Sequence, residues 1–227
     1  MEDWYSLPGF HQPMSSISHL AGAVLFLILG IFLIVSARRD SRRFISCSIF
    51  AFSAVMLLSL SGVFHMFKPG FVTRSVMIRL DVAAIFILIA GTFTPLHTIL
   101  FRGWKSWGIL VLIWVVAVTG VTLRTIFFDN LPIIWGTAIF LLMGWVGLLS
   151  TFMVVKSYGR RAAVPIILGG LFYTVGAVGD AIRWPVLIPN VWGPHETFHL
   201  FVLAGLGTHW HLVAKIAEGK LNYNADA

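Results

Sequence analysis

Apolar residues gather into seven long runs along the chain, and short polar stretches separate the runs. A helix needs about 20 apolar residues to cross the hydrocarbon core of a bilayer. Each run is roughly that long, and the runs lack the alternating pattern of membrane β-strands. They therefore predict transmembrane helices over residues 15–37, 44–67, 80–101, 107–123, 132–155, 162–181 and 195–216.

The short connections predict a single all-α domain, a seven-transmembrane helical bundle that spans residues 1–227. It would carry only a short N-terminal segment, 1–14, and a short C-terminal tail, 217–227. Composition agrees, because 58% of the residues are hydrophobic, 11% are charged and the mean hydropathy is +0.90. Such values lie outside the range of soluble domains. We expect no cleavable signal peptide, since "MEDWYSLPGFHQP" is acidic and aromatic.

The net charge of +7 comes from short basic clusters between the apolar runs, so it reports on topology and anionic lipids rather than on nucleic acid. Seven spans place the termini on opposite sides. The N-terminal side carries Lys68, Arg74, Arg79, Arg124 and Arg183. The C-terminal side carries Arg38, Arg39, Arg42, Arg43, Arg102, Lys105, Lys156, Arg160, Arg161, Lys215 and Lys220. The positive-inside rule therefore predicts a cytoplasmic C-terminus.

Ionisable side chains inside membrane spans are costly, so each one is a candidate for function. His65 falls at the end of the second run, Asp81 at the start of the third, and His195 and His199 at the start of the seventh. Successive spans run in opposite directions. The end of an even span and the start of an odd span therefore meet at one face, and all four residues are predicted to share one depth.

A metal site is the chemistry that these residues predict. His195 and His199 are four residues apart, which places them on one helical face with about 6 Å between their side-chain roots. His65 is the best third ligand, because Asp81 is better used as an acceptor for a metal-bound water. Three ligands plus an exchangeable water form a Lewis-acid site. Three imidazoles favour Zn²⁺, although the ligand types also suit iron or nickel. The only cysteine, Cys47, cannot form a disulfide or a cysteine cluster.

Two neighbouring residues have competing interpretations. Ser61 precedes His65 by one turn, so its hydroxyl either orients the ligand or the bound water, or bonds its own helix. Glu196 completes the metalloprotease pattern His-Glu-x-x-His in "HETFH". However, Gly193 and Pro194 place Glu196 in the first helical turn, where an acidic residue complements the helix dipole. We interpret Glu196 as a residue of the helix start.

The other histidines of the spans are interpreted as packing residues. His97 lies sixteen residues beyond Asp81, about 24 Å along a helix, and His209 lies ten residues beyond His199, about 15 Å. Neither can reach the same ion. We assign no chemistry to His19 or His211 either.

The segments "SGVFH", "RLDVAAIFILIAGTFTPL" and "HETFHLFVLAG" resemble, in order and spacing, the three motifs of the hemolysin III proteins, the bacterial branch of the progestin and adipoQ receptor family. "GGLFYTVGAVGDAIRWP" also looks like the family's approach to its last helix. The resemblance implies zinc bound by His65, His195 and His199, with Asp81 contacting the zinc-bound water and Ser61 nearby. It also implies a multi-pass protein of a bacterial inner (plasma) membrane.

The N-terminal part departs from the family pattern. An acidic residue, an asparagine and a histidine are usual there, whereas this chain has Gln12, Ser15 and His19. Two of the three polar groups are replaced. If the missing carboxylate assists the handling of substrate or protons in the family, the resemblance implies that activity is altered or lost in this chain.

Two functions from different classes fit these observations. The first is a zinc-dependent hydrolase that cleaves a ceramide-like or other lipid amide, with membrane lipids as its partners. The second is a non-catalytic, lipid-sensing or receptor-like protein in which zinc is structural. A pore-forming haemolysin is disfavoured, because a pore needs a polar stripe through the whole bilayer and these polar groups gather at one face. A transporter is a weaker alternative, since no paired repeat is present.

Overall fold

The computed structural model describes residues 5–130 and 133–221, and the regular elements of this part are helices. In chain order they are α1 (Pro13–Ala37), α2 (Ser41–Phe64), α3 (Val72–Leu100), α4 (Trp104–Ile126), η1 (Phe128–Asn130), α5 (Ile133–Trp145), α6 (Gly147–Tyr158), α7 (Arg160–Ala181) and α8 (Pro194–Ala217). Within the described ranges, 7 helical segments are long and apolar enough to cross a membrane, and α5 and α6 together supply one of them, Trp135–Tyr158. The predicted all-α, seven-span architecture is confirmed.

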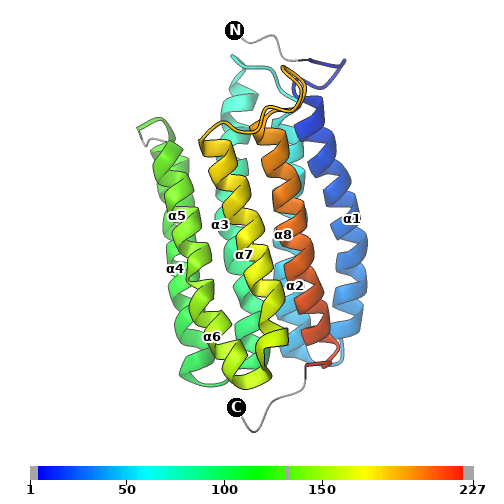
Figure 1. Ribbon diagram of the computed structural model, residues 1–227, viewed down its shortest axis with the longest axis vertical. Coiled ribbons are helices and arrows are strands. Elements are labelled where there is room, and N and C mark those ends of the chain that lie inside the picture. The colour runs from blue at the N-terminus through cyan, green and yellow to red at the C-terminus, as the bar shows by residue number, and fades with distance from the viewer. Residues whose placement is uncertain (1–4, 131–132, 222–227) are drawn as a thin grey trace.

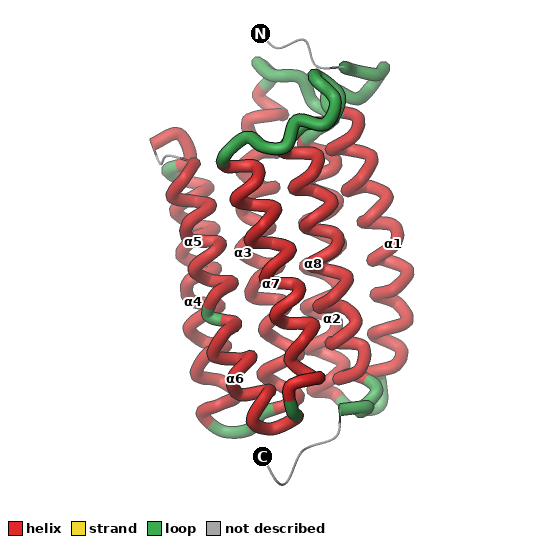
Figure 2. Tube along the Cα trace, in the orientation of Figure 1, coloured by secondary structure: helices red, strands yellow, loops and turns green. Residues whose placement is uncertain are grey.

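The helices run antiparallel in one bundle, with the two ends of the chain at opposite faces (Figure 1). Loops lie almost entirely at these two faces, and the longest of them joins α7 to α8 across the N-terminal face (Figure 2). At the other face, α6 and α7 are joined by Gly159 alone, whose φ of 82° is a left-handed conformation that glycine adopts without strain. Large apolar side chains cover much of the outside, as contact with lipid requires.

Two helix ends at the N-terminal face differ from the prediction. α3 begins at Val72 rather than at residue 80, so Asp81 lies in its third turn. The charged residues Arg74 and Arg79 lower the local hydropathy, but a helix can continue beyond the hydrocarbon core. Arg79 is held there by an ion pair of 2.6 Å to Asp129. The predicted start at residue 132 lies outside the described residues, as do 1–4 and 222–227 of the two terminal segments.

The second predicted helix also ends earlier than expected. α2 stops at Phe64, and His65 is the residue that caps it rather than a residue inside the last turn. The N–H of His65 still donates to the Ser61 carbonyl at 3.2 Å. His65 therefore keeps a helical backbone conformation and stays anchored to the end of α2.

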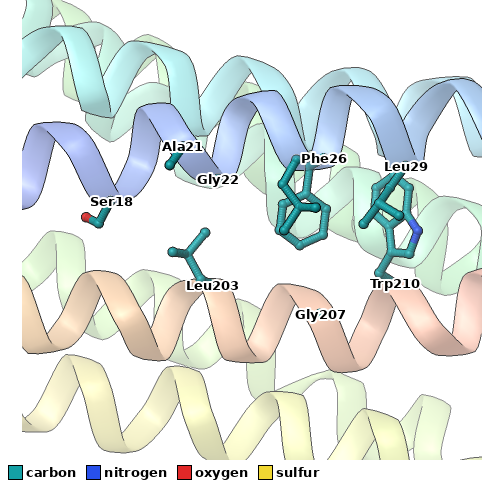
Figure 3. Close-up of a pocket in the computed structure, with 9 residues that line it drawn as sticks. Ser18, Ala21, Gly22, Phe26, Leu29, Leu203, Gly207 and Trp210 are labelled. Carbon is teal, nitrogen blue, oxygen red and sulfur yellow. The ribbon is translucent and has the colours of Figure 1, made fainter.

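Small residues let the helices approach one another closely. Gly22 of α1 faces Leu203 of α8, and Gly62 of α2 faces Leu20 of α1, where an added methyl group would collide with the partner side chain. An apolar groove of about 420 Å³ runs between α1 and α8. Phe26 of α1 and Trp210 of α8 extend into it from the two helices, and Gly22 and Gly207 also line it (Figure 3). Close packing fixes α8, which carries His195 and His199, against α1 and against α2, which ends at His65.

Candidate metal centre

Three histidines meet where α2 ends and α8 begins. His65 follows the last turn of α2, and His195 and His199 occupy the first two turns of α8. His65 and His199 are each 2% exposed, whereas His195 is partly exposed. One nitrogen from each ring lies within 4.8 Å of the other two. The cluster could hold a metal ion, and its members are the three that the sequence predicts.

The spacing of the ring nitrogens suits a metal of the size of zinc. The Nε2 atom of His195 lies 3.2 Å from Nε2 of His65 and 3.2 Å from Nε2 of His199. Tetrahedral zinc with nitrogen ligands at 2.0–2.1 Å would place those nitrogens about 3.3 Å apart. The two distances to His195 therefore match a tetrahedral zinc site, and the ligand nitrogens of His65 and His199 lie within 4.8 Å of each other.

The outward nitrogens of the same rings contact oxygen atoms. Nδ1 of His65 lies 2.7 Å from Oε1 of Gln12, and Nδ1 of His199 lies 3.1 Å from the Ser15 carbonyl. Nδ1 of His195 lies 3.3 Å from a carboxylate oxygen of Asp180. These oxygens can only accept, so each ring carries its proton on Nδ1 and donates it outward.

This proton arrangement leaves three Nε2 lone pairs directed at a shared space. Lone pairs at 3.2 Å repel each other unless a proton or a metal ion lies between them. An outward N–H bonded to a carboxylate, carbonyl or amide oxygen is also the usual support of a metal-bound histidine. The residues present therefore fit a metal ion on their own chemistry.

The N-terminal segment supplies part of this support. The N–H groups of His11 and Gln12 donate to the carbonyls of Met66 and His65, at 3.2 and 3.0 Å, so the segment crosses the end of α2. Partial burial and the nearby charge of Arg74 lower the pKa of His11. The two backbone hydrogen bonds fix Gln12 beside His65.

Glu196 serves the helix start, as the sequence predicts. Its Oε2 atom accepts the N–H of Gly193 at 2.9 Å, at the first turn of α8. Its other oxygen accepts the Ser15 hydroxyl at 2.7 Å. Glu196 is 2% exposed, and it joins α1 to α8 while His195 and His199 turn toward the metal position.

Asp81 and Ser61 line a cavity beside the histidines. Ser61 of α2 and Asp81 of α3 are both part of the cavity wall, so the Ser61 side chain faces beyond its own helix. The charge of Asp81 acts directly on His195. Their roles in handling a water molecule stay predictions.

The cavity has a volume of about 1010 Å³ and a mostly apolar wall. It begins at Asp81, His195 and His199 and continues between the helices as far as Ser150 and His209. His209 is ten residues along α8 from His199, about 15 Å. The three-histidine cluster thus lies at one end of a long, mostly apolar cavity.

The remaining histidines of the spans lie where the sequence places them, with one addition. His97 and His209 lie far from the metal position, as predicted from their spacing. His19 is buried and stacks on His199, with 3.6 Å between the ring centroids. It therefore packs directly on a candidate ligand, although it is not a member of the three-residue cluster.

The sequence interpretation did not identify the supporting residues Gln12, Ser15 and Asp180. Gln12 and Ser15 had been noted only as departures from the family pattern. Asp180 lies in the last turn of α7, which is the sixth membrane span. The end of an even span and the start of an odd span meet at one face, so the rule that placed His65 beside His195 also applies to Asp180. That rule was the available signal for Asp180. The contact of Gln12 with His65 depends on the path of a loop and has no comparable signal.

Seven apolar helices and a buried histidine cluster define an integral multi-pass membrane protein with a site that could bind a metal. The family model described as Haemolysin-III related matches residues 10–210. The chain belongs to this hemolysin III and adipoQ receptor family.

Three relatives illustrate the range of the similarity. Hemolysin-3 of Bacillus cereus is 31% identical over 193 residues, which cover 84% of this chain and 84% of the relative. A Hemolysin-3 homolog of Bacillus subtilis (strain 168) is 28% identical and is covered to 87%. The adiponectin receptor protein of Drosophila melanogaster is 24% identical over 91% of this chain and 51% of its own length.

Proposed function

We propose that this protein is a zinc-dependent hydrolase of lipid amides, and that ceramide-like molecules are its substrate class. One observation carries the proposal: the three-histidine cluster lies at the end of an apolar cavity of about 1010 Å³ whose wall also contains Asp81 and Ser61. A metal held only for stability needs neither a carboxylate beside it nor an apolar chamber leading to it.

His65, His195 and His199 would hold the metal, and three neutral imidazoles suit zinc. Zinc in such a site supplies a Lewis acid that acidifies water and polarises a carbonyl group. The outward hydrogen bonds to Gln12 and Asp180 hold two of the rings in the orientation that ligation requires.

Asp81 is the residue that moves the proton. Its carboxylate accepts a proton from the attacking water and returns it to the amide nitrogen as the C–N bond breaks, so that amide and water become acid and amine. Ser61 orients Asp81 through its hydroxyl. Both are placed by helix ends at one face of the bundle, which keeps the reacting groups together.

The shape of the cavity supports a lipid substrate. Its walls are mostly apolar side chains of several helices, and it runs from the histidine cluster as far as Ser150. An acyl chain buried there leaves water and gains dispersion contacts. The amide of the same lipid would then lie at the polar end, beside Asp81 and His195.

Hydrolysis of a defined lipid amide tests the proposal. Purified protein in detergent would be given a fluorescent ceramide analogue, first as prepared, then after a chelator, and then after added zinc. We expect release of the fluorescent fatty acid, loss of release with the chelator, and recovery with zinc. Metal-loaded, folded protein that cleaves no amide or ester lipid would overturn the proposal.

We further propose that the protein resides in a bacterial inner membrane with its C-terminus in the cytoplasm. Eleven of its basic residues lie on loops and ends of the C-terminal face, and five lie on the opposite side. The metal end would then face outward. Reporter fusions after residue 227 test this orientation: a reporter active only in the cytoplasm is expected to function there, and inactivity would reverse the assignment.

A receptor-like function with a structural metal is the second candidate, favoured by the similarity to the Drosophila adiponectin receptor protein. In that case the ion would only fasten α2 to α8. Asp81→Asn would then leave every phenotype unchanged, whereas loss of a metal ligand would act only through stability. The mostly apolar cavity wall gives no support to a third candidate, a pore-forming haemolysin.

A further inference from the structure

Some buried polar atoms of the cavity wall have no hydrogen-bond partner among the described residues, and two of them belong to neighbouring side chains. They are the hydroxyl of Tyr173 on α7 and Nδ1 of His209 on α8, and both are buried. The two rings are neighbours, with 5.6 Å between their centroids. A polar atom inside a membrane protein is costly when it is unpaired. A ligand that pairs with both atoms would remove that cost.

Four other polar side chains of the same cavity are paired. The hydroxyls of Thr92, Thr151 and Thr174 each donate to the carbonyl four residues earlier in their own helix. The Ser150 hydroxyl lies 2.8 Å from Nε2 of His97. Tyr173 and His209 differ from these residues, whereas the ring nitrogens of His19, beside the histidine cluster, are also unpaired among the described residues.

The rings of Tyr173 and His209 are seated against glycines. An added methyl group on Gly205 would lie 2.9 Å from the Tyr173 ring, and one on Gly169 would lie 2.3 Å from the His209 ring. Contacts this short do not occur in folded proteins, so the two glycines make room for the rings. The pair is thus built into the packing of α7 against α8.

The two atoms select for a particular chemical group. Nε2 of His209 lies 3.4 Å from the Ile166 carbonyl, which can only accept, so Nε2 carries the proton and Nδ1 is an acceptor. The Tyr173 hydroxyl both donates and accepts. A hydroxyl group complements both: it donates to His209 and accepts from Tyr173. A carbonyl or carboxylate has no proton for His209.

We propose that Tyr173 and His209 form a subsite for a hydroxyl group carried in the middle of a lipid acyl chain. This proposal rests on the cavity being the acyl-chain site of the proposed function, but it does not require hydrolysis. His209 lies about 15 Å along α8 from His199. A chain whose carbonyl lies at the metal would therefore bring a mid-chain carbon, and not the carbon next to the carbonyl, to the subsite.

Binding of free fatty acids tests the subsite without any cleavage. The probes are three octadecanoic acids: one unsubstituted, one with a mid-chain hydroxyl, and one with a hydroxyl next to the carboxyl group. Affinities are compared as ratios within each protein variant, so that partition into detergent cancels. We expect the parent to prefer the mid-chain hydroxyl about tenfold, from two hydrogen bonds. We expect no preference for the other hydroxyl.

Tyr173→Phe removes the hydroxyl and keeps the ring, and His209→Leu provides a second variant that removes the acceptor. Each is expected to abolish most of the preference. Thr174→Val is the matched control, because Thr174 lines the same cavity and its hydroxyl is already bonded to Gly170. This control should keep the full preference.

Equal preference in the parent, Tyr173→Phe and His209→Leu would overturn the subsite, as would a parent that does not discriminate among the three acids. The result is separable from the hydrolase proposal. Discrimination without any amide cleavage supports the subsite and contradicts the hydrolase. Cleavage of amides by a protein that does not discriminate among the three acids supports the hydrolase and contradicts the subsite.

Discussion

The bundle holds buried histidines at both of its ends, and the two sites use their ring nitrogens differently. At the C-terminal face, Nδ1 of His97 donates to the Lys105 carbonyl at 3.0 Å, and Nε2 accepts the Ser150 hydroxyl at 2.8 Å. Both nitrogens are satisfied by the chain itself. At the N-terminal face, the three Nε2 atoms of the cluster face one another and only the Nδ1 atoms are bonded to oxygen.

Burial and position at a membrane face are therefore shared by a packing histidine and a candidate ligand. His97 is 0% exposed and His199 is 2% exposed, so exposure does not separate them. The difference lies in whether a lone pair is left without a donor. A polar pair such as His97 and Ser150 joins two helices, whereas convergent lone pairs call for a cation. Four substitutions test this contrast.

The largest effect is expected from Asp81→Asn. Loss of the proton acceptor should reduce lipid amide hydrolysis by about a hundredfold or more, since general base catalysis contributes about 10² to 10⁴. Bound metal and the melting temperature should stay close to those of the parent. Asp129→Asn, which changes a carboxylate on the same face that does not line the cavity, is the control and should hydrolyse normally. Full activity in Asp81→Asn would remove Asp81 from the reaction.

Gln12→Ala should weaken metal binding, because His65 loses the oxygen that orients it at 2.7 Å. Loss of such a supporting hydrogen bond lowers metal affinity by about 10- to 100-fold. Competition with a zinc-sensitive dye measures the change. Gln12→Glu keeps the acceptor and should retain or raise the affinity. Unchanged affinity in Gln12→Ala would show that the contact has no role in orienting the ligand.

Ser150→Ala should act at the other site and only on stability. It leaves Nε2 of His97 without its donor and removes a link between α3 and α6. Hydrogen bonds between membrane helices contribute about 0.6 to 2 kcal/mol, so unfolding in a denaturing detergent should occur correspondingly earlier. Metal content should not change. A loss of metal in Ser150→Ala would break the distinction between the two sites.

The smallest effect is expected from Asp40→Asn, a change at the residue that caps the start of α2 at the C-terminal face. Its carboxylate accepts the Arg43 N–H at 2.9 Å, and this bond lowers the pKa of Asp40. The contribution of the charge is therefore present at neutral pH and is lost as the pH falls through the lowered pKa. Asp40→Asn should lower the melting temperature slightly at neutral pH and match the parent in acid. A difference in melting temperature between Asp40→Asn and the parent that persists in acid would contradict this role of the Asp40 charge.

Hydropathy and helix direction were sufficient to predict the bundle and the residues of the metal cluster. The apolar runs give the spans, and antiparallel order brings His65 to the level of His195. The four-residue spacing of His195 and His199 needs only helix geometry. The early start of α3 was missed, because hydropathy marks the hydrocarbon core and not the end of a helix.

The supporting contacts could not be predicted in the same way. Gln12 reaches His65 because the N-terminal segment folds over the end of α2, and no local pattern encodes that path. His209 has the same surroundings in the sequence as many packing histidines. It is distinguished by the position of the Ile166 carbonyl beside Nε2 and by the lack of a hydrogen-bond partner for Nδ1 among the described residues.

Bound metal per chain is the measurement that tests the central claim most directly. Purified parent protein, His65→Ala, His195→Ala, His199→Ala and His97→Ala would be compared by elemental analysis after removal of loosely bound ions. We predict one zinc per chain in the parent and in His97→Ala, and near-complete loss in the other three variants. Zinc retained by any of those three would remove that residue from the ligand set. A parent protein that binds no stoichiometric metal would contradict the account.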